Sequence, residues 1–104
     1  MYSASSSIRF IAGPLSGQAV PVLSTGLVIG REAGAAQIVI QDAQVSSAHA
    51  WIGMKGDLLC FVDRGSTNGS SVNDRPVTVG QDVFLNKGDV VTLGKSGSVK
   101  FVVE

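Results

Sequence analysis

The sequence has little of what metal sites, disulfides and membrane spans require. It contains a single cysteine, Cys60, and a single histidine, His49, among 104 residues. One cysteine excludes an intramolecular disulfide, and one histidine plus one cysteine in different contexts does not make a metal site. No stretch approaches the roughly 18 apolar residues of a membrane-spanning helix. We therefore expect no metal, no cofactor and no direct membrane contact.

Charge is also scarce and evenly balanced. Charged residues make up 15% of the chain, with eight basic and eight acidic side chains. A protein of zero formal net charge has no general field that attracts nucleic acid or an anionic membrane. Nucleic acid is therefore not an expected partner, and any anion must be bound by a local arrangement of groups.

Helical periodicity is the third absence. Glycine occurs 13 times, and short runs rich in Val, Ile, Leu and Phe lie between the glycines. Short strands at regular spacing, separated by turn signals, are typical of β-sandwiches and barrels. The one helix-like stretch, 31–37, is short, contains Gly34 and runs into the β-branched residues 38–40, so we interpret it as a loop.

The predicted architecture is a single all-β domain over residues 8–104. Residues 1–7 lack the basic and hydrophobic regions of a secretory signal and are expected to be a flexible lead-in. Asn68-Gly69 is the strongest short turn signal, since both residues tolerate positive φ. Cys60 lies in an apolar run and is expected to be a buried small hydrophobe. The predicted strands cover residues 8–12, 18–22, 27–29, 49–54, 58–63, 71–73, 76–78, 82–85, 89–93 and 99–103.

Three polar segments border these strands and are candidates for binding loops: Gly30-Arg31, residues 46–49 and residues 63–69. Loops on a rigid frame are where binding residues concentrate. Arginine offers a planar fork of donors, and hydroxyls add donors without charge, which suits a phosphate. Asn68 offers both a donor and an acceptor for a ligand's peptide backbone. Spacing alone also allows a solvated surface arginine and ordinary turn or capping chemistry for the hydroxyls.

The order and spacing of four motifs resemble the forkhead-associated (FHA) domain. The motifs are GR at 30–31, VSSAHA at 45–50, DRGSTNGSSVN at 63–73 and LNKGDVVTLG at 85–94. The opening segment IRFIAGPLSGQAVPV is similar to the first hairpin of that family. The resemblance covers about the whole chain. It implies an FHA/SMAD-like β-sandwich of about eleven short strands, with loops at one end that recognise phosphothreonine peptides.

The resemblance also implies which residues contact the phosphopeptide. Arg31 matches the arginine of the family's Gly-Arg pair, which contacts phosphate, and Ser46 matches the phosphate-contacting serine of its Ser-x-x-His motif. Thr67 matches a residue that assists, and Asn68 matches the asparagine that bonds the peptide backbone. Ser47 also belongs to the expected contact set. Many relatives carry Arg, Lys or Asn at that position, so Ser47 removes a second cation.

Other residues are expected to support the binding loops. His49 matches an architectural histidine that ties the loops together, and Gly69 shapes the turn. Gly30 and Asn73 are expected to assist in the same way. Gln44 aligns with a position that often sets specificity, and because it is uncharged no acidic preference is expected from it.

Enzymatic functions fit the sequence less well. Ser46 and His49, with Asp42 or Asp63, have the residue types of a hydrolase triad, but there is no G-x-S-x-G elbow and no helix to support a nucleophile. The segment 94–96 looks like the end of a P-loop, but the upstream glycine is one residue too far away and no helix follows. No catalytic residue is expected.

The sequence thus predicts a non-enzymatic, cytoplasmic module, part of a larger protein, that reads phosphothreonine on a partner. The alternative is an FHA-like interaction or oligomerisation module that binds independently of phosphate. The joint presence of Arg31, Ser46, Thr67 and Asn68 favours the first reading, and the missing cation at Ser47 favours the second.

Overall fold

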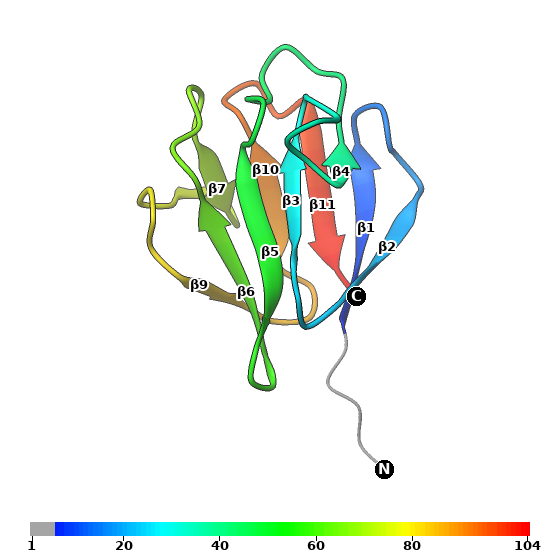
Figure 1. Cartoon of the computed structure of the whole chain (residues 1–104), viewed down its shortest axis with the longest axis vertical. Helices are drawn as coiled ribbons and strands as arrows, with labels where there is room; N and C mark the ends of the chain where they lie inside the picture. Colours follow the sequence, from blue (N-terminus) through cyan, green and yellow to red (C-terminus); the bar gives the residue numbers. More distant parts are fainter. Residues whose placement is uncertain (1–5) are drawn as a thin grey trace.

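The computed structural model describes residues 6–104 and consists of two β-sheets packed face to face (Figure 1). One sheet contains β1 (Ser6–Ala12), β2 (Ala19–Val22), β7 (Ser70–Val72), β8 (Arg75–Pro76), β10 (Val90–Leu93) and β11 (Val99–Val103). The other contains β3 (Leu27–Gly30), β4 (Ile38–Val39), β5 (Ala50–Lys55), β6 (Leu58–Asp63) and β9 (Val83–Leu85).

The strand orders are β2-β1-β11-β10-β7-β8 in the six-stranded sheet and β4-β3-β5-β6-β9 in the five-stranded sheet. The predicted all-β sandwich of about eleven strands is therefore confirmed. Residues 6–104 contain no helix with the length and hydropathy that a membrane span requires.

Alternating side chains of both sheets form the core. In β11, buried Val99, Phe101 and Val103 alternate with half-buried residues that face outward. The ring of Phe101 lies 5.5 Å from that of Phe10 in the same sheet and 6.2 Å from that of Phe61 in the other sheet. Each large apolar side chain that is fully buried stabilises the fold by roughly 1.5–3 kcal/mol, so this aromatic contact holds the two sheets together. Cys60 is buried, as predicted.

The strongest turn signal of the sequence does not form the turn expected of it. Gly69 has a positive φ of 78°, but Asn68 does not adopt one, and the segment leads directly into β7. The two-residue turn with positive φ at both positions is instead formed by Asn73 (50°) and Asp74 (67°), between β7 and β8. This is the pattern of a type I′ hairpin turn.

The ends of several elements differ from the sequence prediction. Ser6 and Ser7 pair with β2 and so belong to β1, whereas the rest of the predicted lead-in, residues 1–5, lies outside the described residues. The strand predicted over 76–78 is instead Arg75–Pro76, because the tight turn places Arg75 opposite Val72. Residues 31–37 form a loop, as predicted.

Three loops gather at one end of the sandwich, at the top of Figure 1, together with the end of β3. We call them the serine loop (residues 40–49), the asparagine loop (residues 64–69) and the lysine loop (residues 94–98). β1 begins and β11 ends at the opposite end of the molecule (Figure 1).

Candidate functional site

Arg31 stands immediately after β3 and is joined to the serine loop through its backbone. Its N–H donates to the Ser46 carbonyl at 2.9 Å, and the N–H of Glu32 donates to the Ser47 carbonyl at 3.4 Å. The Arg31 side chain is exposed and takes part in no ion pair within residues 6–104. Its guanidinium is therefore not used by the described part of the fold and is available to an anion.

Gly30 allows the serine loop to approach β3 closely. A Cβ atom at Gly30 would lie 2.0 Å from the Ser47 carbonyl oxygen and 2.7 Å from its carbonyl carbon. These are backbone atoms and cannot rotate away as a flexible side chain would. The absence of a side chain at Gly30 thus sets the distance between Arg31 and the serine loop.

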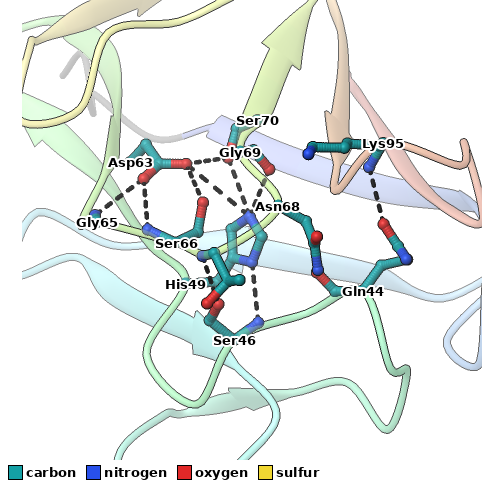
Figure 2. Close-up of polar contacts among 11 residues, drawn as sticks. Gln44, Ser46, His49, Asp63, Gly65, Ser66, Asn68, Gly69, Ser70 and Lys95 are labelled. Atoms are coloured by element: carbon teal, nitrogen blue, oxygen red, sulfur yellow. Dashed lines mark hydrogen bonds and ion pairs between the residues drawn. The ribbon is translucent and has the colours of Figure 1, made fainter.

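His49 is fully buried beneath the loops and is hydrogen-bonded to two of them (Figure 2). Its Nδ1 accepts a hydrogen bond from the Ser46 N–H at 3.1 Å. The neutral ring therefore carries its proton on Nε2, which donates to the Gly69 carbonyl at 2.9 Å and lies 3.1 Å from Ser70 Oγ. The imidazole fastens the serine loop to the end of the asparagine loop.

Asp63, at the end of β6, shapes the asparagine loop from the inside. Its Oδ1 accepts from the N–H groups of Gly65 and Ser66, each at 2.9 Å. Its Oδ2 accepts from the hydroxyls of Ser66 and Ser70, each at 2.6 Å. Asp63 Oδ2 lies 3.9 Å from His49 Nε2. The Ser70 hydroxyl contacts both side chains and so links the histidine to the aspartate.

At neutral pH one of the two buried groups is neutral and the other is negatively charged. Burial lowers the pKa of His49, although the Gly69 carbonyl and Asp63 act in the other direction, so the imidazole is neutral. Burial alone would raise the pKa of Asp63, but the hydrogen bonds from Ser66, Ser70 and the backbone N–H groups outweigh it and hold the pKa below 3.8. A buried carboxylate is thus stabilised by neutral donors.

The hydroxyl-bearing residues of the site meet between the serine and asparagine loops. Ser46 Oγ accepts a hydrogen bond from the Thr67 N–H at 3.0 Å, which joins the two loops directly. Ser46 is half-buried, whereas Ser47 and Thr67 are exposed. Backbone hydrogen bonds join Arg31 and Glu32 to Ser46 and Ser47, and Ser46 in turn contacts Thr67, so these loop segments are neighbours.

Asn68 lies beside this group and contacts Gln44. Its Nδ2 donates to the Gln44 carbonyl at 3.3 Å, and Gln44 Oε1 accepts from the Lys95 N–H at 3.0 Å (Figure 2). Gln44 was the candidate specificity residue of the sequence. Its side chain is engaged in a bridge between the serine loop and the lysine loop instead of being free for a ligand.

Asn73, which is expected from the sequence to support the binding loops, makes its side-chain contacts away from them. Its side chain donates to Asp89 Oδ1 at 3.1 Å and accepts from the Val90 N–H at 3.0 Å. These contacts fasten the turn between β9 and β10, whereas the loops meet β7 at its other end, where Ser70 lies. The cause is the type I′ turn, which places Asn73 at the far end of that short strand.

Two functional features were missed by sequence reasoning. Ser70 was not among the expected site residues, yet its hydroxyl contacts both His49 and Asp63. A hydroxyl directly after the Asn68-Gly69 pair was the signal that could have identified it. Lys95 was considered only as part of a failed P-loop, and nothing in its local sequence indicates that it lies next to Gln44.

Comparison with known proteins shows which family this chain resembles. The family model described as the inner membrane component of T3SS, cytoplasmic domain (Yop-YscD), matches residues 9–102. An FHA domain-containing protein of Arabidopsis thaliana is 31% identical over 100% of the chain, which covers 28% of that protein. The chain spans 17–28% of the length of the curated relatives that it matches.

Solved FHA domains share the fold. The solution structure of the FHA domain of an Arabidopsis thaliana hypothetical protein is 28% identical, with a TM-score of 0.88 over 98% of this chain and 86% of that chain. A structure from a study of phosphothreonine-dependent FHA domain interactions is 31% identical, with a TM-score of 0.80 over 96% of this chain and 95% of that one. The chain therefore belongs to the Yop-YscD cytoplasmic-domain family, whose fold is FHA-like, and it is a forkhead-associated domain.

Proposed function

We propose that this domain binds a phosphothreonine-containing segment of a partner protein. The observation that carries the proposal is that Arg31, whose exposed guanidinium has no ion-pair partner within residues 6–104, stands on a segment hydrogen-bonded to the loop of Ser46 and Ser47, which also contacts Thr67. These residues lie on loops that a buried hydrogen-bonded cluster holds in place. Such a site offers one cation and several neutral donors to a single anion.

The phosphate is bound by Arg31 and the neighbouring hydroxyls. A phosphothreonine carries roughly −1.5 to −2 charge and three strong acceptor oxygens, and arginine can engage two of these oxygens at once. Ser46 Oγ already accepts a bond from the Thr67 N–H, so its own hydroxyl proton is left to donate to the ligand. Ser47 and Thr67 add hydroxyl donors from the exposed rim.

The peptide backbone is held by Asn68. One amide N–H of its side chain is used on the Gln44 carbonyl. The second N–H and the side-chain carbonyl oxygen remain for the N–H and C=O groups of a bound peptide. The solved FHA domain from the study of phosphothreonine-dependent interactions, which aligns over 96% of this chain, supports the same ligand class.

The domain acts by binding and not by catalysis. His49, the single histidine, is 0% exposed and accepts the backbone N–H of Ser46 instead of its hydroxyl proton. It is therefore not placed as a general base for Ser46. The partial coverage of the curated relatives supports a module within a larger protein, and the description of the matched family supports a cytoplasmic location.

Titration of the ¹⁵N-labelled domain with a phosphothreonine peptide library tests this function. Each phosphopeptide is matched by the same peptide with threonine and with phosphoserine. Amide shifts are expected at Arg31, Ser46, Ser47, Thr67 and Asn68 with phosphothreonine and not with threonine. An equal response to phosphorylated and unphosphorylated peptides would exclude the phosphate site and favour a module that binds independently of phosphate.

A further inference from the structure

A groove of about 550 Å³ adjoins the proposed phosphopeptide site on the outer face of the six-stranded sheet. Its floor is a row of cross-strand neighbours, in which Thr92 pairs with both Ser71 and Lys100, and Ser71 pairs with Pro76. The asparagine loop and the lysine loop form its upper rim. The groove therefore continues from the residue that is proposed to hold the peptide backbone, Asn68.

The lysine loop is locked to both loops that carry the site. The Lys95 N–H donates to Gln44 Oε1 at 3.0 Å, and the Gly94 N–H donates to the Gly69 carbonyl at 2.8 Å. A Cβ atom at Gly94 would lie 2.6 Å from Gln44 Cβ, and Gly94 has a φ of +87°. Because Gln44 also accepts the Asn68 amide, one residue sets the positions of both Asn68 and Lys95.

Two lysines without ion-pair partners line the end of the groove that is nearest β11. In Figure 2 the Lys95 side chain extends from its backbone bond to Gln44 back toward the Asn68–Gly69 segment. The Lys100 side chain lies against the lysine loop, since a methyl group at Gly97 would lie 3.5 Å from its Cε and 3.9 Å from its Nζ. Within residues 6–104 neither lysine forms an ion pair.

The acidic residue of the groove lies at its other end. Asp74 belongs to the turn between β7 and β8, and the row of Ser71 and Thr92 separates it in the sheet from Lys100. The charged side chains that line the groove are therefore positive at the lysine end and negative at the turn. An elongated ligand placed in it is favoured when its anionic group faces the lysines.

We propose that this groove receives the bound peptide beyond its phosphothreonine, and that Lys95 and Lys100 select an anionic side chain there. The inference rests on the proposed function, because the phosphothreonine and Asn68 set where the peptide enters. An extended chain spans at most about 3.3–3.6 Å per residue, so the selected side chain lies within a few residues of the phosphothreonine. Gln44 acts as a positioning residue for Asn68 and Lys95. The positive charge that attracts the anionic side chain comes from Lys95 and Lys100.

Binding of phosphothreonine peptides that carry one aspartate at each successive position on either side of the phosphorylated residue tests this inference. The rest of each peptide is neutral, and a second series carries phosphoserine in place of aspartate, so that carboxylate and phosphate are compared. For the natural domain, we expect one position where the anionic side chain raises affinity about two- to fivefold, the range of an exposed ion pair. Lys95→Gln and Lys100→Gln should each reduce this preference.

A matched control and a charge reversal make the test specific. Lys87 is exposed in the turn between β9 and β10, outside the groove, so Lys87→Gln should leave the positional preference unchanged. Lys95→Glu should prefer a lysine at the same peptide position. Rescue of this kind requires a direct charge contact and does not follow from a merely structural role.

The outcomes separate this inference from the proposed function. Binding that requires phosphothreonine but shows no positional preference for an anionic residue would overturn the role of the lysines and leave the phosphate site intact. An equal loss of affinity for neutral and acidic phosphopeptides in Lys95→Gln would overturn it too, because Lys95 would then act on the phosphate itself. Absence of binding to every phosphopeptide would instead count against the proposed function.

Discussion

The buried cluster beneath the loops and the exposed residues above it contain similar polar groups in opposite states. His49, Asp63 and Ser70 are buried, and the described residues include no buried side-chain polar atom without a hydrogen-bond partner. The side chains of Arg31 and Thr67 are exposed and form no hydrogen bond or ion pair within residues 6–104. The lower layer is satisfied internally and serves stability, whereas the upper layer keeps its donors for a ligand. Mutations in the lower layer should therefore change mainly stability, and mutations in the upper layer should change mainly ligand binding.

The largest expected effect is the loss of binding in Arg31→Ala. Removing the one cation that faces the phosphate should cost binding about 2–5 kcal/mol, as for other desolvated charge contacts. Stability should change by less than about 0.5 kcal/mol, because the side chain has no partner in the fold. Calorimetric titration with a phosphothreonine peptide and urea unfolding measure the two quantities.

Arg75→Ala is the matched control for this variant. Arg75 is exposed in β8 and lies outside the proposed phosphate site. Affinity should be nearly unchanged in this variant. If both arginine variants lost affinity equally, the effect would be one of general charge and the comparison between the two layers would fail.

Next in size is the loss of stability in His49→Ala. The change leaves a cavity, removes the partner of the Ser46 N–H and takes one of two donors from the Gly69 carbonyl, at a cost of about 3 kcal/mol of unfolding free energy. Binding should weaken as a consequence, because both loops lose their common anchor. Urea unfolding with an unchanged m value would record the loss. A variant of natural stability that fails to bind would contradict the architectural role.

The pH dependence of stability should be smaller and comes from the same buried layer. The pKa of His49 is lowered from 6.5, so below this pH the unfolded chain binds a proton that the folded state resists, and stability falls as the pH decreases. The pKa of Asp63 is lowered from 3.8, which extends the fall at still lower pH. The slope for one proton is at most about 1.4 kcal/mol per pH unit.

Unfolding measured from pH 8 down to about pH 2 checks this dependence. His49 is the single histidine of the chain, so no other histidine titrates near 6.5. His49→Gln should lack the component that begins near that pH and keep the lower one. A natural domain whose stability rose as the pH fell through 6.5 would contradict the neutral state of the buried ring.

The smallest expected effect is a gain of affinity in Ser47→Arg. Ser47 is exposed next to the proposed phosphate site, so a cation there adds an ion pair worth about 0.2–1 kcal/mol, and the gain should shrink at high salt. Ser47→Gln, which adds length without charge, is the control. Equal affinities for the two variants at low salt would show that this position does not face the phosphate.

Local signals in the sequence predicted much of the fold, because they depend on neighbouring residues. The apolar runs at 58–63 and 99–103 are strands with the predicted bounds. Gly56, with a positive φ of 64°, lies in the two-residue turn that joins β5 to β6. The Asn68-Gly69 turn could not be predicted correctly in the same way. Whether that pair turns the chain depends on which strand β7 joins, and β7 pairs with β10, far along the sequence.

The composition and motif order of this chain were enough to predict a β-sandwich. They also indicated which loops carry Arg31, Ser46, Thr67 and Asn68. Only the tertiary structure decided which polar residues are internally satisfied and which stay free. Hydrogen bonds such as those of His49 with Gly69 and of Gln44 with Lys95 join residues that lie 20 and 51 positions apart. No local pattern encodes such a contact, because it exists only after the two sheets have packed and brought the loops to one end.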